Sequence, residues 1–170
     1  MEFNFIYYIK MEPIELDKTD LALLDQLQTD AGLSNLALSE RLALTPPTCL
    51  RRVRRLESLG LIERRVALLN PQRLGALLGH GLQAMVEVSL DRQDSEALDA
   101  FEGRCVAEGA VSLCWRVASG PDFVLMVQVR DMPAYSALVQ RLFTQDANVR
   151  NVRAFFCTRQ AKMAPRVSLG

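Results

Sequence analysis

The stretch TPPTCLRRVRRLESLG, residues 45–60, predicts a helix with two unlike faces. Thr45 is the expected N-cap, Pro46 takes the first helical position, where a missing N–H costs nothing, and Gly60 is the expected stop. At 3.6 residues per turn, one face carries the apolar side chains of Cys49, Leu50, Val53 and Leu56. The opposite face carries polar and basic side chains, namely Thr48, Arg51, Arg52 and Arg55, with Arg54 at its margin.

Arginine is concentrated around this helix, although the whole chain has 20 basic and 20 acidic residues and no net charge. Between Thr48 and Arg65 the arginines are Arg51, Arg52, Arg54, Arg55, Arg64 and Arg65, against Glu57 and Glu63, a local charge of +4. A charge run is also typical of a solvated helix surface. Arginine without lysine, however, suits bidentate contact with phosphates and guanine edges, which favours DNA binding.

The predicted DNA-binding set combines the start of this helix with its basic face. We expect three side chains to read base edges, namely Thr48, Arg51 and Arg55. Four arginines are expected to hold phosphates, namely Arg52, Arg54, Arg64 and Arg65. Thr45 and Pro46 complete the set at the start of the helix.

Two shorter helices are predicted before this one. Asp17 is the expected N-cap of the first, followed by an acidic Asp20 in its first turn, and its apolar face is predicted as Leu21, Leu24 and Leu27. Ser34 is the expected N-cap of the second, with Leu38 and Leu42 four residues apart on one side. A tight connection at Ala43 and Leu44 joins it to the arginine-rich helix, which makes a helix-turn-helix. After Gly60, residues 61–69 alternate enough to predict a strand or wing.

The remainder of the chain predicts the element order βαββαβ. Residues 82–90 alternate, with Ala84, Val86, Val88 and Leu90 on one face, and a helix is expected from Asp94 or Ser95 to Gly109. Two strands within 110–119 and 122–131 flank a Ser-Gly-Pro turn, Pro133 opens a further helix, and 149–159 form a last strand. This order is that of a ferredoxin-like, ACT-like sandwich.

The predicted fold class is therefore α+β, with a winged helix-turn-helix followed by the ferredoxin-like module. The expected boundaries are a tail at 1–15, the DNA-binding domain at 16–66, a linker strand and hinge at 67–81, the βαββαβ domain at 82–162 and a tail at 163–170. No apolar run approaches the roughly 20 residues that cross a bilayer, and the first residues lack the features of a signal peptide. We expect a cytoplasmic protein without a membrane partner.

Residue types that carry catalysis or bind metals form no constellation in this sequence. Four cysteines, Cys49, Cys105, Cys114 and Cys157, are scattered without zinc-site spacing and are interpreted as reduced core residues. His80 is the only histidine and has no triad partners nearby, while Trp115 is interpreted as a packing or interface residue. We expect no catalytic residue, no metal and no cofactor.

The run LDKTDLALLDQLQTDAGLSNLALSERLALTPPTCLRRVRRLESLGLIERRVALLNPQRLG, residues 16–75, resembles the N-terminal domain of Lrp/AsnC transcriptional regulators. The resemblance is closest in LTPPTCLRRVRRLESLGLI, residues 44–62. One departure is Gly32, where many family members carry an arginine. The βαββαβ half resembles the family's effector-binding and oligomerisation module, so the resemblance spans about residues 16–162.

The resemblance implies a homodimer or higher homo-oligomer that binds a pseudo-palindromic double-stranded operator and responds to a small effector, often an amino acid. The effector residues implied are Ser119, Gly120, Pro121, Asp122 and Phe123. A glycine turn bares backbone amides for a carboxylate, and an aspartate can meet an ammonium group. The simpler interpretation is that Asp122 only caps the hairpin turn. The spacing from Gly120 to Asp122 is also shorter than in many relatives.

Two alternatives from other classes stay open. Some tetrapyrrole (siroheme) decarboxylases are built on a similar frame, but such chemistry needs basic or histidine groups in a deep pocket, and this chain offers one histidine in a loop. A metabolite sensor that acts on a protein partner would not need six arginines around an exposed helix. We therefore expect a regulator of transcription and not an enzyme.

Overall fold

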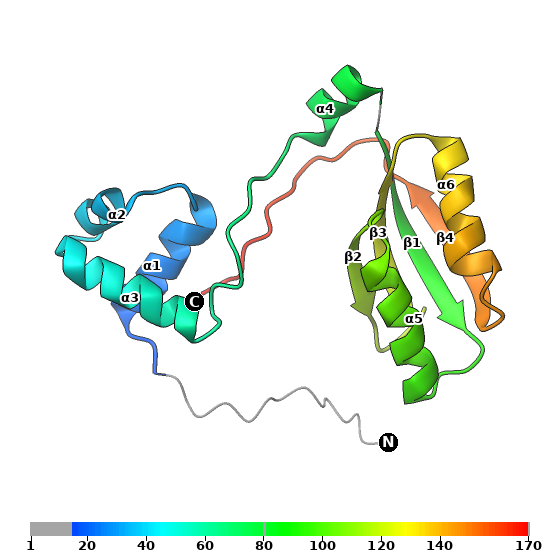
Figure 1. Cartoon of the computed structure of the whole chain (residues 1–170), viewed down its shortest axis with the longest axis horizontal. Coiled ribbons are helices and arrows are strands. Elements are labelled where there is room, and N and C mark those ends of the chain that lie inside the picture. The colour runs from blue at the N-terminus through cyan, green and yellow to red at the C-terminus, as the bar shows by residue number, and fades with distance from the viewer. Residues whose placement is uncertain (1–14, 80, 170) are drawn as a thin grey trace. The chain divides into compact units, whose positions relative to one another are not determined.

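A computed structural model describes residues 15–79 and 81–169, which divide into two compact units (Figure 1). The first unit holds the described residues up to Ala67 together with the C-terminal segment from Ala164. The second unit spans Leu68 to Met163. Most of the predicted N-terminal tail, as well as His80, lies outside the described residues.

The first unit contains three helices, α1 (Lys18–Thr29), α2 (Asn35–Arg41) and α3 (Pro46–Ser58). Asp17 is the N-cap of α1, as predicted, and it also forms a capping box with Asp20. Ser34 is the predicted N-cap of α2 and accepts a hydrogen bond from the Ala37 amide. Gly60, with φ of +71°, follows the end of α3. The amides of Gly60 and Leu61 donate to carbonyls of the last helical turn, so the predicted glycine stop is confirmed.

A small core holds these three helices together. Its buried residues among those described are Leu23, Leu27, Leu38, Cys49, Val53 and Leu56. Two predictions for this core were wrong in detail. The buried face of α1 is centred on Leu23 and Leu27 instead of Leu21, and Leu50 on α3 is 39% exposed. The reason is geometric, because α3 contacts its neighbours over a narrower stripe than its apolar pattern indicates.

The predicted strand at 61–69 is not formed, and the predicted linker strand is replaced in part by a helix, α4 (Pro71–Leu78). A strand requires a neighbouring strand for its backbone N–H and C=O groups, and the described part of the chain offers residues 61–69 none. Asn70 caps α4 through the Arg73 amide, Pro71 takes the first helical position and Gly79 ends it with φ of +65°. These signals for a helix were present in the sequence.

The second unit follows the predicted order βαββαβ. Its elements are β1 (Leu82–Leu90), α5 (Ser95–Ala107), β2 (Val111–Arg116), β3 (Phe123–Val129), α6 (Met132–Val139), continued by a π-helical turn η1 (Gln140–Thr144), and β4 (Val149–Phe156). The four strands are antiparallel in the order β2-β3-β1-β4. The ferredoxin-like fold is thereby confirmed (Figure 1).

Helices α5 and α6 cover one face of this sheet and enclose the larger core. Ala84, Val86, Val88 and Leu90 of β1 are buried there, as the alternating pattern predicted. Phe101 of α5 lies between two further rings, with centroid distances of 4.9 Å to Phe123 and 6.5 Å to Phe143. The other face of the sheet carries exposed apolar side chains, namely Met85, Leu113, Trp115 and Phe155.

The four cysteines are unpaired thiols, as predicted, but they do not share one environment. Cys49 and Cys105 are core residues, and burial raises the pKa of the Cys105 thiol to about 12. Cys157 follows β4 and is exposed, so its prediction as a core residue was wrong. No helix in the described ranges is both long and apolar enough to span a bilayer.

Candidate functional site

The start of α3 is anchored on α2. Thr45 occupies the N-cap position, as predicted, but its hydroxyl donates to Thr48 Oγ1 at 2.9 Å and caps no backbone amide. Pro46 and Pro47 remove two of the N–H groups that an N-cap would otherwise serve. The Pro46 carbonyl accepts a hydrogen bond of 2.9 Å from Asn35 Nδ2 of α2, which fixes the angle at which α3 leaves the turn.

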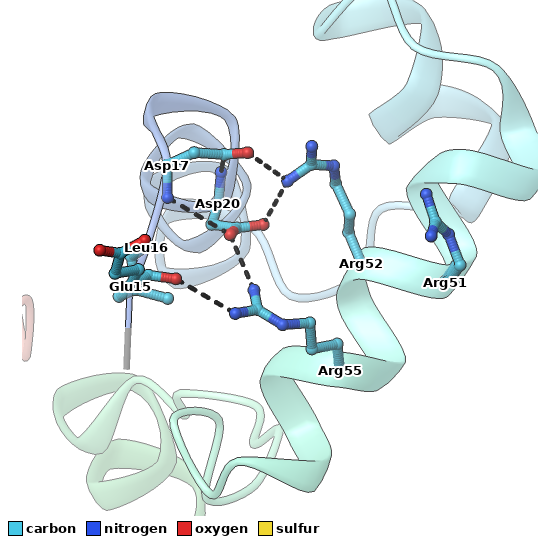
Figure 2. Close-up of a pocket in the computed structure, with 7 residues that line it drawn as sticks. All are labelled: Glu15, Leu16, Asp17, Asp20, Arg51, Arg52 and Arg55. Atoms are coloured by element: carbon cyan, nitrogen blue, oxygen red, sulfur yellow. Dashed lines mark hydrogen bonds and ion pairs between the residues drawn. The ribbon is translucent and has the colours of Figure 1, made fainter. Parts of the chain in front are cut away.

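The arginines of α3 divide into two pairs with different surroundings. Arg51 and Arg54 are exposed, and neither forms an ion pair or a side-chain hydrogen bond with any described residue. Arg52 and Arg55 instead reach across to the start of α1. Figure 2 shows their guanidinium groups directed at two carboxylates there, while the guanidinium of Arg51 lies apart from them.

The carboxylate of Asp20 connects Arg52 with Arg55. Its side chain is only 2% exposed, its Oδ1 accepts from Arg52 Nη1 at 2.8 Å and its Oδ2 accepts from Arg55 Nη1 at 2.9 Å. Asp17 Oδ2 accepts a second hydrogen bond from Arg52 Nη1 at 2.7 Å. The Glu15 carbonyl accepts from Arg55 Nη2 at 3.1 Å. Both arginines are therefore held at two points each.

These contacts shift the pKa values of Asp17 and Arg52 in the direction that keeps both side chains charged. The Asp20 backbone amide, followed by the Arg52 guanidinium, holds the pKa of the Asp17 carboxyl below its ordinary value of 3.8. The hydrogen bond from Arg52 to Asp20, and then that to Asp17, raises the pKa of the Arg52 guanidinium above its ordinary value. Four arginines against two carboxylates leave a charge of +2 on this side of α3, half of what the arginines alone would give.

Arg64 and Arg65 follow α3 on the segment where the wing was expected. Arg65 Nη2 lies 2.8 Å from Glu57 Oε1, at the end of α3, and Arg64 Nε lies 3.8 Å from Glu63 Oε1. All four side chains are exposed. The structure thus places Thr45, Pro46, Thr48 and four arginines on one helix, with the last two arginines just beyond its end.

The predicted effector residues lie in the turn between β2 and β3. Gly120 has φ of +93°, a conformation that favours glycine, and the Asp122 amide donates to the Val88 carbonyl at 2.9 Å. Asp122 Oδ2 accepts a hydrogen bond of 2.7 Å from the Leu90 amide on β1. Phe123 is fully buried beneath α5. Ser119 and Gly120 are exposed and Pro121 is half-buried. The backbone of this turn is therefore accessible to solvent, while the Asp122 side chain connects the turn to β1.

The ion pairs between α1 and α3 were missed in the sequence. Asp17 and Asp20 were interpreted as cap and first-turn residues only, and the capping box accounts for their spacing without any partner on α3. No short-range pattern connects them with Arg52 or Arg55, more than 30 positions away. Among the described residues, no group of three or more His, Cys, Asp or Glu side chains is arranged to hold a metal ion.

Comparison with known protein families gives two matches, one for each unit. Residues 16–63 match the model of a winged helix-turn-helix DNA-binding domain. Residues 83–167 match the Lrp/AsnC ligand-binding domain. The chain is 35% identical over 156 residues to a leucine-responsive regulatory protein of Rhizobium meliloti, covering 92% of this chain and 97% of the relative. It is 33% identical over 153 residues to the Escherichia coli protein of that name, covering 90% and 91%.

Solved structures lead to the same family. A transcriptional regulator from Neisseria meningitidis, determined in complex with L-Met, is 32% identical with a TM-score of 0.81 and is matched over 91% of this chain and 97% of its own. An AsnC family regulator from Agrobacterium tumefaciens is 28% identical with a TM-score of 0.81 over the same shares. The chain therefore belongs to the Lrp/AsnC family and is a DNA-binding transcriptional regulator with a ligand-binding domain.

Proposed function

We propose that the outward side of α3 reads DNA in the major groove, with Arg51 as its principal base-reading side chain. The observation that carries this proposal is the division of the arginines. Arg51 and Arg54 are exposed and have no partner among the described residues, whereas Arg55, the other predicted base reader, is engaged by Asp20 and the Glu15 carbonyl. Thr48, one turn nearer the start of α3, adds a hydroxyl to the reading surface.

The remaining predicted residues serve as phosphate contacts in this proposal. Arg54, Arg64 and Arg65 are exposed, and the last two make only surface ion pairs, which a phosphate can replace at little cost. Arg52 contributes less than these three, because Asp17 and Asp20 hold one of its terminal nitrogens and offset its charge. Thr45 and Pro46 orient the first turn of α3.

The test is a DNA titration of an Arg51→Ala, Arg54→Ala double variant against the wild type. Duplexes are first selected by the wild type from a random-sequence pool, and affinity is measured by fluorescence anisotropy between 50 and 300 mM salt. We expect binding to weaken strongly, because the base contact of Arg51 is lost, and the slope of log affinity against log salt to become shallower by about 0.9, for the one phosphate contact of Arg54. Arg150→Ala, an exposed arginine of the second unit, is the matched control. Equal binding by the double variant would refute the assignment.

We infer that the effector is an amino acid bound at the β2–β3 turn of residues 119–123. Support comes from the match of residues 83–167 to a ligand-binding domain and from the L-Met bound by the related Neisseria regulator. Asp122 Oδ1 accepts no hydrogen bond from the described residues, so it is available to an ammonium group while Oδ2 holds β1. Gly120 leaves the turn backbone open to a carboxylate.

A thermal-shift series with the twenty amino acids, L-Met first, tests the effector proposal. An effector at 100 times its Kd would stabilise the protein by about 2.7 kcal/mol, which is readily detected. Asp122→Asn retains an oxygen that can accept from the Leu90 amide but removes the negative charge. We expect this variant to fold and to lose the ligand-induced shift. An unchanged shift in Asp122→Asn would place the effector elsewhere.

We further propose that the open face of the sheet joins two copies of the chain. Paired positions on adjacent strands form a row across this face, namely Leu113, Met126, Met85 and Phe155. Three of these side chains are between 38% and 42% exposed. A second copy presents the same apolar row, so the surface is self-complementary about a two-fold axis. In such a dimer, the two α3 helices would bind DNA half-sites about one helical turn apart. The protein would act in the cytoplasm, where the chromosome lies.

Oligomer mass measured by light scattering tests this interface. Met85→Lys places a charge at the centre of the row, and we expect it to shift the protein toward the monomer. Val106→Lys, on α5 and 73% exposed, makes the same charge change away from this face and is the control. A dimer that persists unchanged in Met85→Lys would exclude this face.

A further inference from the structure

We propose that Asp20 is a positioning residue for DNA recognition, because its buried carboxylate holds Arg52 and Arg55 and so confines the unpaired positive charge of α3 to Arg51 and Arg54. This inference rests on the proposed function of α3. It adds a residue of α1, outside the recognition helix, to the determinants of DNA specificity.

The Asp20 carboxylate bridges Arg52 and Arg55. Each oxygen of Asp20 accepts from a different arginine, at 2.8 Å from Arg52 and 2.9 Å from Arg55 (Figure 2). These arginines are three positions apart on α3, so one anion at the start of α1 fixes two neighbouring side chains on the recognition helix. Removing a partner from a buried carboxylate leaves a desolvated charge, so the two arginines are held more firmly than in a surface ion pair.

Without Asp20, Arg52 and Arg55 would be free to contact DNA phosphates. An unrestrained arginine carries five N–H donors on a long side chain and can meet any nearby phosphate, whatever the sequence. Such contacts raise affinity for all DNA equally, while specificity depends on contacts that only the correct bases permit. By holding Arg52 and Arg55, Asp20 lowers non-specific attraction and leaves Arg51 to discriminate.

A purely structural role for Asp20 makes a different prediction. Asp20 also belongs to the capping box of α1, and loss of that role would lower stability without altering how binding depends on salt. Release of the arginines would instead increase the number of phosphate contacts. The salt dependence of binding to random-sequence DNA therefore separates positioning from structural support.

The experiment compares Asp20→Asn with Asp25→Asn in the full chain. Asp25 lies on the same helix and pairs with Arg166 at 2.7 Å, so its variant makes the same charge change and releases an arginine that is not on α3. Each protein is titrated with a random-sequence duplex and with a duplex selected by the wild type. Asp17→Asn is a second test variant, since Asn is an equally good N-cap and Asp17 is exposed.

For Asp20→Asn we expect tighter binding to the random duplex and a salt slope steeper by about 0.9, which corresponds to one added phosphate contact. The ratio of selected to random affinity should fall by about fivefold or more. Asp17→Asn should move both quantities in the same direction by less, and it decides the matter if Asp20→Asn fails to fold. Asp25→Asn should match the wild type.

The proposal is overturned if both Asp20→Asn and Asp17→Asn keep the wild-type slope and ratio, or if Asp25→Asn changes them equally. Failure of the proposed function is seen separately, because the wild type would then select no sequence from the random pool.

Discussion

The two units are stabilised in different proportions by apolar packing and by charge. Among the described residues, the hydrophobic core of the second unit buries thirteen, three of them phenylalanines, whereas that of the first unit buries six. The first unit adds a buried carboxylate that bridges two arginines. A small three-helix bundle must leave its recognition helix at the surface, so it has less apolar area to enclose and connects its helices partly through ion pairs.

Because the two cores are separate clusters, truncating a large side chain in one core should lower the stability of that unit and leave the other unit unchanged. The single tryptophan, Trp115, lies on β2 and reports on the second unit. DNA binding reports on the first.

Phe101→Ala should produce the largest loss, because this ring contacts both Phe123 and Phe143 in the larger core. We expect the free energy of unfolding of the second unit to fall by about 3–5 kcal/mol. Urea denaturation followed by Trp115 fluorescence measures this loss. Leu77→Ala, at a side chain that is 81% exposed, is the control and should leave the midpoint unchanged. A similar midpoint for both variants would contradict the assigned core.

Leu23→Ala should remove about 2–4 kcal/mol from the first unit, where Leu23 is fully buried among only six core residues. Since so small a unit has little stability to lose, we expect DNA binding to disappear while the Trp115 transition stays near its wild-type midpoint. Leu36→Ala, on α2 and 57% exposed, should bind DNA normally. If the Trp115 midpoint fell as far as in Phe101→Ala, the two units would not be energetically separate.

Glu108→Gln should have a smaller and pH-dependent effect on the second unit. The hydrogen bond from Arg141 holds the pKa of the Glu108 carboxyl below its ordinary value of 4.5. A lowered folded-state pKa stabilises the fold above pH 4.5, and this contribution is lost as the pH falls through the lowered value. We expect the variant to lose less than about 1 kcal/mol at pH 6 and its difference from the wild type to shrink as the pH falls below 4.5. A constant difference across that range would contradict the pKa assignment.

Gln28→Ala should have the smallest effect, although it tests a contact specific to the first unit. The Gln28 side chain pairs with both the amide and the carbonyl of Val167, at 3.0 and 3.1 Å, and so holds the C-terminal segment on α1. These bonds are exposed, so their loss should lower the free energy of unfolding only slightly, by about 0.5–1 kcal/mol, and shift the thermal midpoint correspondingly little. Increased proteolysis after Lys162 or Arg166 would show the segment released. Thr29→Ala, whose hydroxyl bonds only within α1, is the control.

The elements that were predicted well have local causes. The βαββαβ order followed from alternating strands and from caps such as Asp94, which accepts from the Ala97 amide as a helix start requires. The helix-turn-helix followed from Asp17, Ser34 and the prolines of α3. The failures are non-local. Residues 61–69 have a strand-like pattern but no partner strand among the described residues, and Cys157 has an apolar residue type at an exposed site.

The candidate sites show the same division. The sequence placed the nine predicted DNA-binding residues on or beside one helix, since helical periodicity alone brings Arg51, Arg52 and Arg55 to one side. It could not show that Arg52 and Arg55 turn toward α1, because rotamers depend on charges brought near by folding. In the effector turn, the sequence located Gly120 and Asp122, but hydrogen bonding of Asp122 to the Leu90 amide depends on the pairing of β1 with β3.

The sequence by itself determined the fold class and the position of the basic helix, since capping, periodicity and turn chemistry act over a few residues. Only the tertiary structure decided which arginines stay unpaired. That decision rests on a carboxylate at Asp20 that is 2% exposed and lies more than 30 positions from its partners. A buried charge is costly unless an opposite charge pairs with it. The partner can come from any part of the chain that folding brings near, so sequence spacing does not reveal it.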